Sequence, residues 1–370
     1  MNWPVNKLNA VCEISMGQAP DGSTYNHSAD GLPLVAGAGD FGDYFPSVKK
    51  YTSAPGKRSA VGDIILCIRA TIGDTNWSDK EYCLGRGVAG LRARDGLLNS
   101  RFLWHFISGR RSELEARGTG STFKQVSRAD IAEWLIPTPP VAEQQRIAAI
   151  LDKADSLRRK RQEAIRLADE FLRAVFIDLF GTLDSQTHAQ VSFGDIAHLD
   201  APMVDPTSDE YADLLHVGPD RIEKGNGQLL ACETARAEGL ISKKFIFDEG
   251  YVLYSKIRPA LKKCTLAEFR GLCSADMYPV RPVEGQVTRE FIWGLLLSDA
   301  FDRYIDTLPD RANIPKLNRT ELNSFQFRLP PIKLQKKYSD IVSSTMKLKR
   351  RHQNFLAEAD SLPASFQFFI

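Results

Sequence analysis

A glycine-rich stretch near the amino terminus is the first pattern that could do chemistry. Residues 37–42, from Gly37 to Gly42, match the G-x-G-x-x-G pattern and follow an apolar run. A dinucleotide or S-adenosylmethionine (AdoMet) site needs this loop to open a helix. Here Phe45 and Pro46 follow at once, and a second parallel-strand pattern is missing. We therefore interpret the stretch as a glycine-rich loop.

Thiol and metal chemistry have little support in the sequence. The six histidines are scattered without a His-x-x-x-His pattern, so we predict no metal site. The cysteines include no Cys-x-x-Cys pair, and we expect buried thiols. The start of the chain lacks a signal-peptide pattern, and no apolar run is long enough to span a membrane, which predicts a cytoplasmic protein. The cysteines are Cys12, Cys67, Cys83, Cys232, Cys264 and Cys273.

Basic side chains are the remaining chemical signal. The net charge of +2 says little, but its distribution is uneven. Residues 44–70 hold five basic side chains against one acid, and residues 243–263 hold six against two, whereas residues 174–220 hold nine acids and no lysine or arginine. Such segregation indicates basic faces that suit a polyanion.

An internal repeat supplies the elements that must position these side chains. Pro-Pro-Val-Ala-Glu-Gln-Gln at residues 139–145 returns as Pro-Pro-Ile-Lys-Leu-Gln-Lys at residues 330–336, an offset of 191. Apolar residues follow each copy at heptad spacing, which predicts two helices of a coiled coil. Arg161 and His352 fill the one polar position in each copy and suit a register-setting site. The predicted seam residues are Ile147, Ile150, Leu157, Phe171, Tyr338, Ile341, Leu348 and Phe355.

The halves also correspond upstream of each helix. Residues 62–69 and 250–258 are apolar runs entered from a glycine, and we predict strands with one extra residue in the second copy. Residues 102–107 and 291–297 predict helices, each followed by a polar loop and a strand that leads into the double proline.

Length and composition indicate a globular chain of two or more domains. The 370 residues are 43% hydrophobic and 25% charged, which argues against disorder and fibrous repeats. The predicted fold class is α+β: two mixed α/β domains separated by two long antiparallel coiled-coil helices, with a pseudo-twofold internal repeat. The helices should be antiparallel because the second domain starts where the first helix ends. We expect a domain at 1–139, a helix at 140–181, a linker at 182–192, a domain at 193–329 and a helix at 330–370.

This arrangement resembles the specificity (S) subunit of bacterial type I restriction-modification systems. The most specific pieces are residues 136–147, around the double proline, and the Gly-Asp-Ile-Ile-Leu stretch at 62–66 with Thr71-Ile72-Gly73 after it. The second copy departs from the pattern, since Leu334 replaces the acid at the position of Glu143. The resemblance covers essentially the whole chain.

The resemblance implies a DNA-binding role without catalysis. Each globular unit would be a target-recognition domain that reads one half of a bipartite site in double-stranded DNA. The helices would fix the spacing and dock two methyltransferase (modification) subunits, with restriction/translocase subunits as further partners. This chain would hold no cofactor, and AdoMet, ATP and Mg²⁺ are expected in the partner subunits.

Ten side chains are candidates for contact with DNA. Most contacts should go to phosphates, whereas Arg311 with Asn313, and Arg69 with Gln125, suit the bidentate edges of guanine and adenine. The candidates are Lys57, Arg58, Arg69, Lys124, Gln125, Lys256, Arg258, Arg311, Asn313 and Lys316.

Two alternative hypotheses remain open at this stage. One is an AdoMet- or nucleotide-dependent DNA-modifying enzyme that uses the loop from Gly37 to Gly42. The other is a coiled-coil scaffold that does not bind DNA. Salt-dependent binding of duplex DNA without a cofactor would distinguish the recognition subunit from both.

Overall fold

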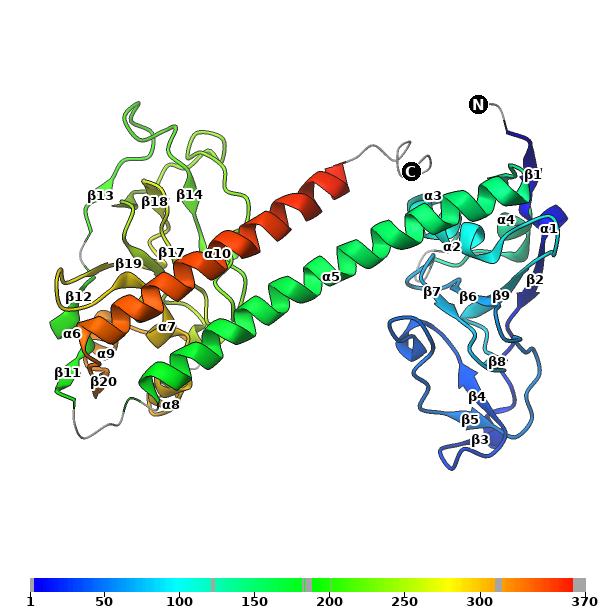
Figure 1. Cartoon of the computed structure of the whole chain (residues 1–370), viewed down its shortest axis with the longest axis horizontal. Helices are drawn as coiled ribbons and strands as arrows, with labels where there is room; N and C mark the ends of the chain where they lie inside the picture. Colours follow the sequence, from blue (N-terminus) through cyan, green and yellow to red (C-terminus); the bar gives the residue numbers. More distant parts are fainter. Residues whose placement is uncertain are drawn as a thin grey trace. The chain divides into compact units, whose positions relative to one another are not determined.

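The chain divides into two compact units that share one long helix. The computed structural model describes residues 3–120, 124–181, 183, 188–199, 201–309 and 315–361. The first unit comprises residues up to 160 together with those from 357 onward, and the second comprises residues 161–356. Helix α5 (Val141–Phe180) belongs to both units (Figure 1).

The described strands of the first unit form two four-stranded sheets and a two-stranded ribbon. They are β1 (Val5–Lys7), β2 (Cys12–Met16), β3 (Tyr25–Asn26), β4 (Leu32–Val35), β5 (Tyr51–Thr52), β6 (Ile64–Cys67), β7 (Thr75–Trp77), β8 (Cys83–Leu84), β9 (Val88–Ala93) and β10 (Leu135–Pro137). The sheet orders are β2-β9-β6-β7 and β3-β5-β4-β8, with the ribbon β1-β10. The predicted strand at residues 62–69 is thus confirmed as β6, whose four residues are all buried.

Short helices pack against the sheet β2-β9-β6-β7 of the first unit. They are α1 (Leu8–Val11), α2 (Ser100–Gly109), α3 (Arg111–Ala116) and α4 (Arg128–Ala132), with 3₁₀ turns η1 (Gly22–Thr24) and η2 (Ala38–Asp40). Helix α2, predicted at residues 102–107, begins where the Asn99 side chain accepts a hydrogen bond from the Phe102 N–H at 3.0 Å. Helix α4 begins with a capping box between Ser127 and Asp130.

The second unit repeats the strand order of one four-stranded sheet and of the ribbon, whereas the two strands of the parallel pair exchange places in the other sheet. Its strands are β11 (Gln190–Ser192), β12 (Ala197–His198), β13 (Met203–Val204), β14 (His216–Val217), β15 (Lys244–Phe247), β16 (Val252–Ser255), β17 (Cys264–Leu266), β18 (Gly271–Cys273), β19 (Met277–Pro282) and β20 (Gln326–Arg328). The sheets are β12-β19-β16-β17 and β13-β15-β18-β14, with the ribbon β11-β20. The helices are α6 (Phe193–Ile196), α7 (Arg289–Leu296), α8 (Asp299–Asp306), α9 (Arg319–Asn323) and α10 (Ile332–Ser361), with turns η3 (Pro219–Arg221) and η4 (Pro259–Leu261).

The Pro-Pro-x-x-x-Gln motif places a buried glutamine in the first turn of each long helix. The Gln144 amide donates to Leu97 O at 3.0 Å and Pro139 O at 2.8 Å, and its oxygen accepts from Asn99 N at 2.8 Å. Gln335 likewise donates to Pro330 O at 2.8 Å and accepts from Thr288 N at 3.0 Å. Both side chains are fully buried, so the motif ties each helix to the loop that begins α2 or α7.

The remainder of each long helix packs by a stripe that differs from the predicted heptad seam. Ile147 and Tyr338 are buried and Ile150 and Ile341 are half-buried, as a packed stripe requires. Leu157, which lies in the first unit, is 43% exposed. In the second unit Phe171, Leu348 and Phe355 are 50%, 53% and 38% exposed.

The seam prediction was wrong for Phe171 and Leu348. Their buried neighbours Leu172 and Lys349 take the packed positions instead. On α5 the buried side chains continue through Phe176 and Phe180, at intervals of four residues. A straight α-helix drifts by about 20° per heptad relative to a 3.5-residue repeat, so over the several heptads from Ile147 to Phe171 the packed face of α5 moves toward the next position.

Polar pairs connect α5 with α10 inside the second unit. Arg161 and His352 were predicted to set the register, and Arg161 Nη1 lies 3.4 Å from His352 Nδ1. The Arg161 guanidinium also lies 3.6 Å from the Phe355 ring centroid. Lys349 Nζ donates to Asp169 Oδ1 at 2.6 Å, with side chains only 3% and 14% exposed. These contacts, together with Phe176 against Tyr338, run in opposite directions along the two helices and make the pair antiparallel.

Replacing the buried glutamine should destabilise the first unit. Gln144→Met keeps the length of the side chain but leaves the backbone groups Leu97 O, Asn99 N and Pro139 O without a hydrogen-bond partner. We expect the free energy of unfolding to fall by about 3 kcal/mol, since each buried unsatisfied group costs about 1–3 kcal/mol. Urea unfolding of Gln144→Met and of Gln145→Met, at the exposed next position, gives the comparison. Equal losses in the two variants would contradict this role.

The buried ion pair should show strong coupling. Lys349→Met leaves the Asp169 carboxylate without its partner and should cost about 3–5 kcal/mol in the free energy of unfolding. Combining it with Asp169→Leu should recover most of that loss, because no buried charge then remains. A double-mutant cycle by urea unfolding measures this coupling, and strictly additive losses would show that the pair does not hold α5 against α10.

Candidate nucleic-acid interface

The loop that follows β6 carries the first group of candidate residues. The thiol of Cys67 donates to Arg69 O at 3.1 Å, and Arg69 forms an isolated β-bridge with Gln125. Ala70 has a φ of +59°, a conformation that costs a non-glycine residue free energy. The structure therefore brings Arg69 and Gln125 together, and Lys124 lies next to them in the chain.

The second unit builds the same loop after β16. The Ser255 hydroxyl donates to Ile257 O at 3.1 Å, Ile257 forms the bridge with Lys316, and Arg258 has a φ of +48°. Lys256 places its Nζ 5.7 Å from the Tyr278 ring centroid. The candidates Lys256, Arg258 and Lys316 thus gather at one loop cluster.

These matching contacts correct the predicted alignment of the halves. Cys67 corresponds to Ser255, and Ile257 takes the place of Arg69, so the two strands align without the extra residue predicted for the second copy. Arg258 matches Ala70, which also has a positive φ. The two loops share a backbone but carry their cations at different positions.

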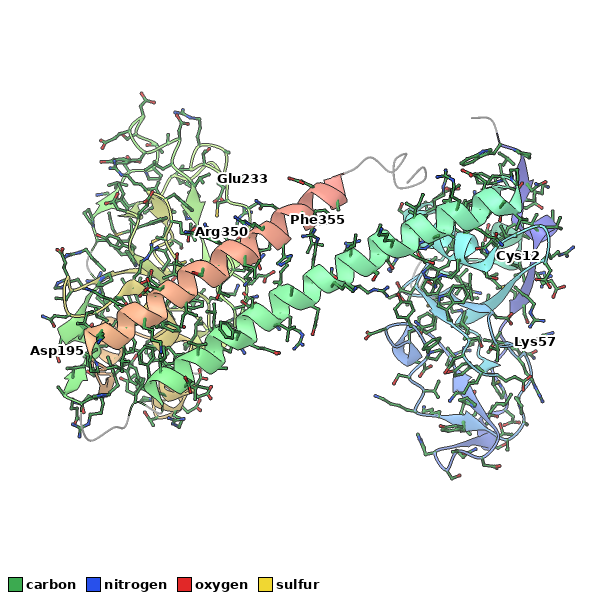
Figure 2. All side chains as sticks on the ribbon, viewed as in Figure 1. Cys12, Lys57, Asp195, Glu233, Arg350 and Phe355 are labelled. Atoms are coloured by element: carbon green, nitrogen blue, oxygen red, sulfur yellow. The ribbon has the colours of Figure 1, made fainter. Side chains whose placement is uncertain are left out.

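The remaining DNA-contact candidates make fewer contacts with the rest of the chain or fall outside the described residues. Lys57 and Arg58 are exposed, and Leu84 N of β8 donates to Lys57 O at 2.7 Å. Figure 2 shows Lys57 in the first unit. Arg58 lies 3.9 Å from Glu81, a distance at which an exposed pair contributes little. Lys316 lies 3.6 Å from Asp276. Arg311 and Asn313 fall outside the residues that the structure describes.

The single acid within the basic segment 44–70 is neutralised. Asp63 is 5% exposed, and its two carboxylate oxygens accept from Arg92 Nε at 2.7 Å and Arg92 Nη2 at 2.9 Å. Hydrogen bonding to this carboxylate raises the pKa of Arg92 above its ordinary value. The exposed charge of the segment is therefore positive.

The glycine-rich loop does not open an α-helix. It forms the 3₁₀ turn η2, after which Phe41 bridges Pro46. The helix that a dinucleotide or AdoMet site requires is therefore not formed by these residues. Next to the loop is a pocket of about 350 Å³ lined by Arg69 and by Arg86, which was not among the predicted residues. Arg86 stands between Gly85 and Gly87, and only the folded arrangement brings it to the loop.

The cysteines offer no reactive thiol among the sites described. Five of the six are buried, and Cys232 is half-buried. Burial raises the pKa of Cys12 to about 12 and also raises the pKa of Cys83 and Cys232 above the ordinary value. Within the described residues no group of three or more His, Cys, Asp and Glu side chains could hold a metal ion.

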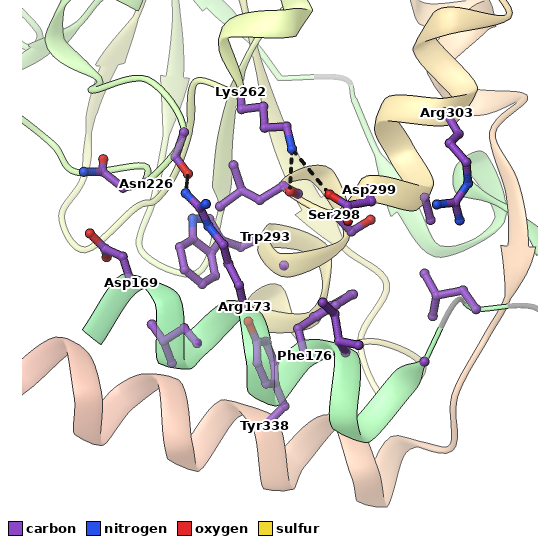
Figure 3. Close-up of a pocket in the computed structure, with 18 residues that line it drawn as sticks. Asp169, Arg173, Phe176, Asn226, Lys262, Trp293, Ser298, Asp299, Arg303 and Tyr338 are labelled. Carbon is purple, nitrogen blue, oxygen red and sulfur yellow. Dashed lines mark hydrogen bonds and ion pairs between the residues drawn. The ribbon is translucent and has the colours of Figure 1, made fainter. Parts of the chain in front are cut away.

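A pocket of about 360 Å³ in the second unit is lined by side chains that hold α5 in place (Figure 3). Arg173 on α5 donates to Gly225 O at 2.7 Å across the pocket, above Trp293. Lys262 pairs with Asp302 and donates to Leu297 O at 3.3 Å. The polar groups of Arg173 and Lys262 in this pocket are therefore already paired with other parts of the second unit.

Comparison with known proteins finds a family that matches the first part of the chain. Residues 1–167 match the family described as type I restriction modification DNA specificity domain. This part of the chain is similar to the type I restriction-modification specificity subunits. The match confirms the resemblance predicted from the sequence. In the described part of the chain, no helix is both long enough and apolar enough to span a bilayer.

Individual relatives carry the same description. The chain is 35% identical over 172 residues to the putative type I restriction enzyme MjaX specificity subunit of Methanocaldococcus jannaschii, a match that covers 45% of this chain and 40% of that subunit. It is 24% identical over 309 residues to the type I restriction enzyme EcoDI specificity subunit of Escherichia coli, covering 73% and 68%. The chain therefore spans less than half the length of the first of these relatives.

A solved structure shows the same fold. The S subunit of a type I restriction-modification system from M. genitalium superposes with a TM-score of 0.65 at 15% identity, over 100% of this chain and 95% of that one. At this identity the likeness concerns the fold alone. The coarse prediction of a mixed α and β chain is confirmed.

Proposed function

We propose that this chain is the DNA-recognition subunit of a type I restriction-modification complex, without catalysis of its own. The observation that carries the proposal is the cationic loop that follows the central strand in both units, β6 and β16. In each case the loop is bridged to a second polar segment, at Gln125 or Lys316. The specificity-domain match over residues 1–167 supports the same role for the first unit.

Each unit reads one half of a bipartite duplex site in this proposal. The shared order of the sheets β2-β9-β6-β7 and β12-β19-β16-β17 supports two equivalent readers, and the different cations on matching loops support different half-sites. Cations directed at phosphates position each unit, while side chains that reach base edges give specificity. In this proposal a pseudo-twofold axis relates the two units.

The long helices act as spacer and docking surface. Helix α5 contributes Ile147 to the core of the first unit and Phe176 to that of the second, so one continuous element connects both readers. Its pairing with α10 as an antiparallel coiled coil would fix the gap between the half-sites. Two methyltransferase subunits, which use AdoMet, and restriction subunits, which use ATP and Mg²⁺, supply catalysis.

Duplex binding by the full-length chain tests the proposal. We expect binding to duplex DNA without any cofactor, and the logarithm of the affinity should fall linearly with the logarithm of the salt concentration. Fluorescence anisotropy with labelled duplex between about 50 and 200 mM salt provides the measurement. Binding that requires AdoMet, or a chain that methylates DNA by itself, would favour the enzyme hypothesis, and absence of binding would favour the scaffold.

Reading by halves makes a sharper prediction. Arg258→Asn removes one of the three cations of the second loop cluster and introduces a residue that tolerates positive φ. We expect relaxed recognition of one half of the target and no change in the other, measured as the methylated motif in cells that also carry the partner subunits. Arg270→Asn, at another exposed arginine of the second unit, should leave both halves unchanged. Relaxation of both halves by Arg258→Asn would contradict independent reading.

A further inference from the structure

The pocket beside the glycine-rich loop offers only hydrogen-bond donors and cations from its side chains. Its lining residues are Ala36, Gly37, Ala38, Gly39, Arg69, Ala70, Thr71, Arg86 and Gly87. No carboxylate and no aromatic ring is among them. The nearest acid of the loop, Asp40, accepts a hydrogen bond from Ala36 N at 2.8 Å. Such a lining suits an anion and gives a nucleobase no ring on which to stack.

The two arginines of the pocket have hydrogen-bond donors without partners in the described residues. Arg69 is half-buried, and its Nε is fully buried without a hydrogen-bond partner. An unsatisfied buried donor costs about 1–3 kcal/mol, so a native structure that keeps one calls for an explanation. Arg86 is exposed, and no ion pair or hydrogen bond joins it to the rest of the described chain. The Arg86 guanidinium is therefore available to a ligand, and no side-chain hydrogen bond or ion pair within the described residues occupies that of Arg69.

The repeat gives an internal comparison for this pocket. In the first unit Gly85 N donates to Val35 O at 2.8 Å, and in the second Ser274 N donates to Val217 O at 3.0 Å. The parallel pairs β4–β8 and β14–β18 therefore correspond residue by residue.

The second unit has neither arginine of the pocket. Counted from the matched strands, Ala275 takes the place of Arg86, and Ile257 takes the place of Arg69. The backbone is nonetheless built in the same way. The fold does not require the arginines, so their presence in the first unit points to a ligand.

The glycines of the loop serve access rather than packing. A Cβ built on Gly37 or Gly39 would meet no other atom within 4 Å, and neither residue has a positive φ. The matching position of the second unit, two residues after β14, is Pro219 instead of Gly37. Glycine here leaves backbone exposed beside the arginines, as close approach of a phosphate requires.

We infer that this pocket binds one backbone phosphodiester of duplex DNA, held by Arg69 and Arg86 over the bare backbone at Gly37 and Gly39. The inference rests on the proposed function and adds a contact to it. The contact is made by the first unit alone, and it positions the DNA without reading its sequence. Free inorganic phosphate shares this chemistry but lacks the deoxyribose that the alanine methyl groups can contact.

Replacement of Arg86 tests the contact through its salt dependence. A duplex of about 30 base pairs of arbitrary sequence suffices as a probe, because a phosphate contact is independent of sequence. For the full-length chain, Arg86→Gln should weaken binding and reduce the slope of log affinity against log salt by about 0.9. Arg94→Gln is the matched control, since Arg94 is exposed at the other end of β9 and loses the same charge. An equal slope change in both variants, or none in Arg86→Gln, would overturn the inference.

A glycine pair tests access without changing charge. Gly39→Ala adds a methyl group over the bare backbone and should weaken duplex binding, whereas Gly22→Ala, in the equally open 3₁₀ turn η1, should not. If the wild-type chain fails to bind duplex, the proposed function fails; if it binds and Gly39→Ala binds equally well, only this inference fails. Competition of duplex binding by millimolar AdoMet or ATP, lost in Arg86→Gln, would identify a nucleotide site instead.

Discussion

A buried glutamine in the first turn of each long helix is the interaction on which the architecture depends. The side chain of Gln144 satisfies three backbone groups that would otherwise be buried without partners, and Gln335 does the same in the second unit. These bonds join a helix to the loop before α2 or α7 and so fix where the helix leaves its domain. Because α5 then enters a second core through Phe176 and Phe180, one helix serves both units.

The two units separate the requirements of folding from those of recognition. Matching hydrogen bonds from a side chain to the backbone, such as those of Cys67 and Ser255, recur in both units and build the same loop. The exposed side chains on that framework differ, with arginine at position 69 and isoleucine at 257. Loops on a rigid scaffold can change their contacts without changing the fold. The arrangement therefore permits each unit to acquire its own DNA contacts.

Buried, periodic features were predictable from the sequence. The double-proline repeat, the strand β6 and the helices α2 and α7 all follow from local apolar patterns that burial enforces. The packed face of the long helices was harder to predict, because a straight helix departs from the 3.5-residue repeat and over several heptads moves burial on α5 from Phe171 to Leu172. Arg86 could not be found at all, since a single exposed arginine between glycines gains its meaning from the loop that the fold brings beside it.

Spacing by the helices is the central claim, and lengthening both of them tests it most directly. One heptad inserted between Lys160 and Arg161, with another between Leu356 and Ala357, falls at the boundaries of the units and leaves the contacts within each unit in place. Each helix grows by about 10 Å. The methylated motif of the variant assembled with its partners should keep both half-sites and gain about three base pairs between them, at about 34 Å per ten base pairs. An active complex whose motif keeps the original gap would contradict the account.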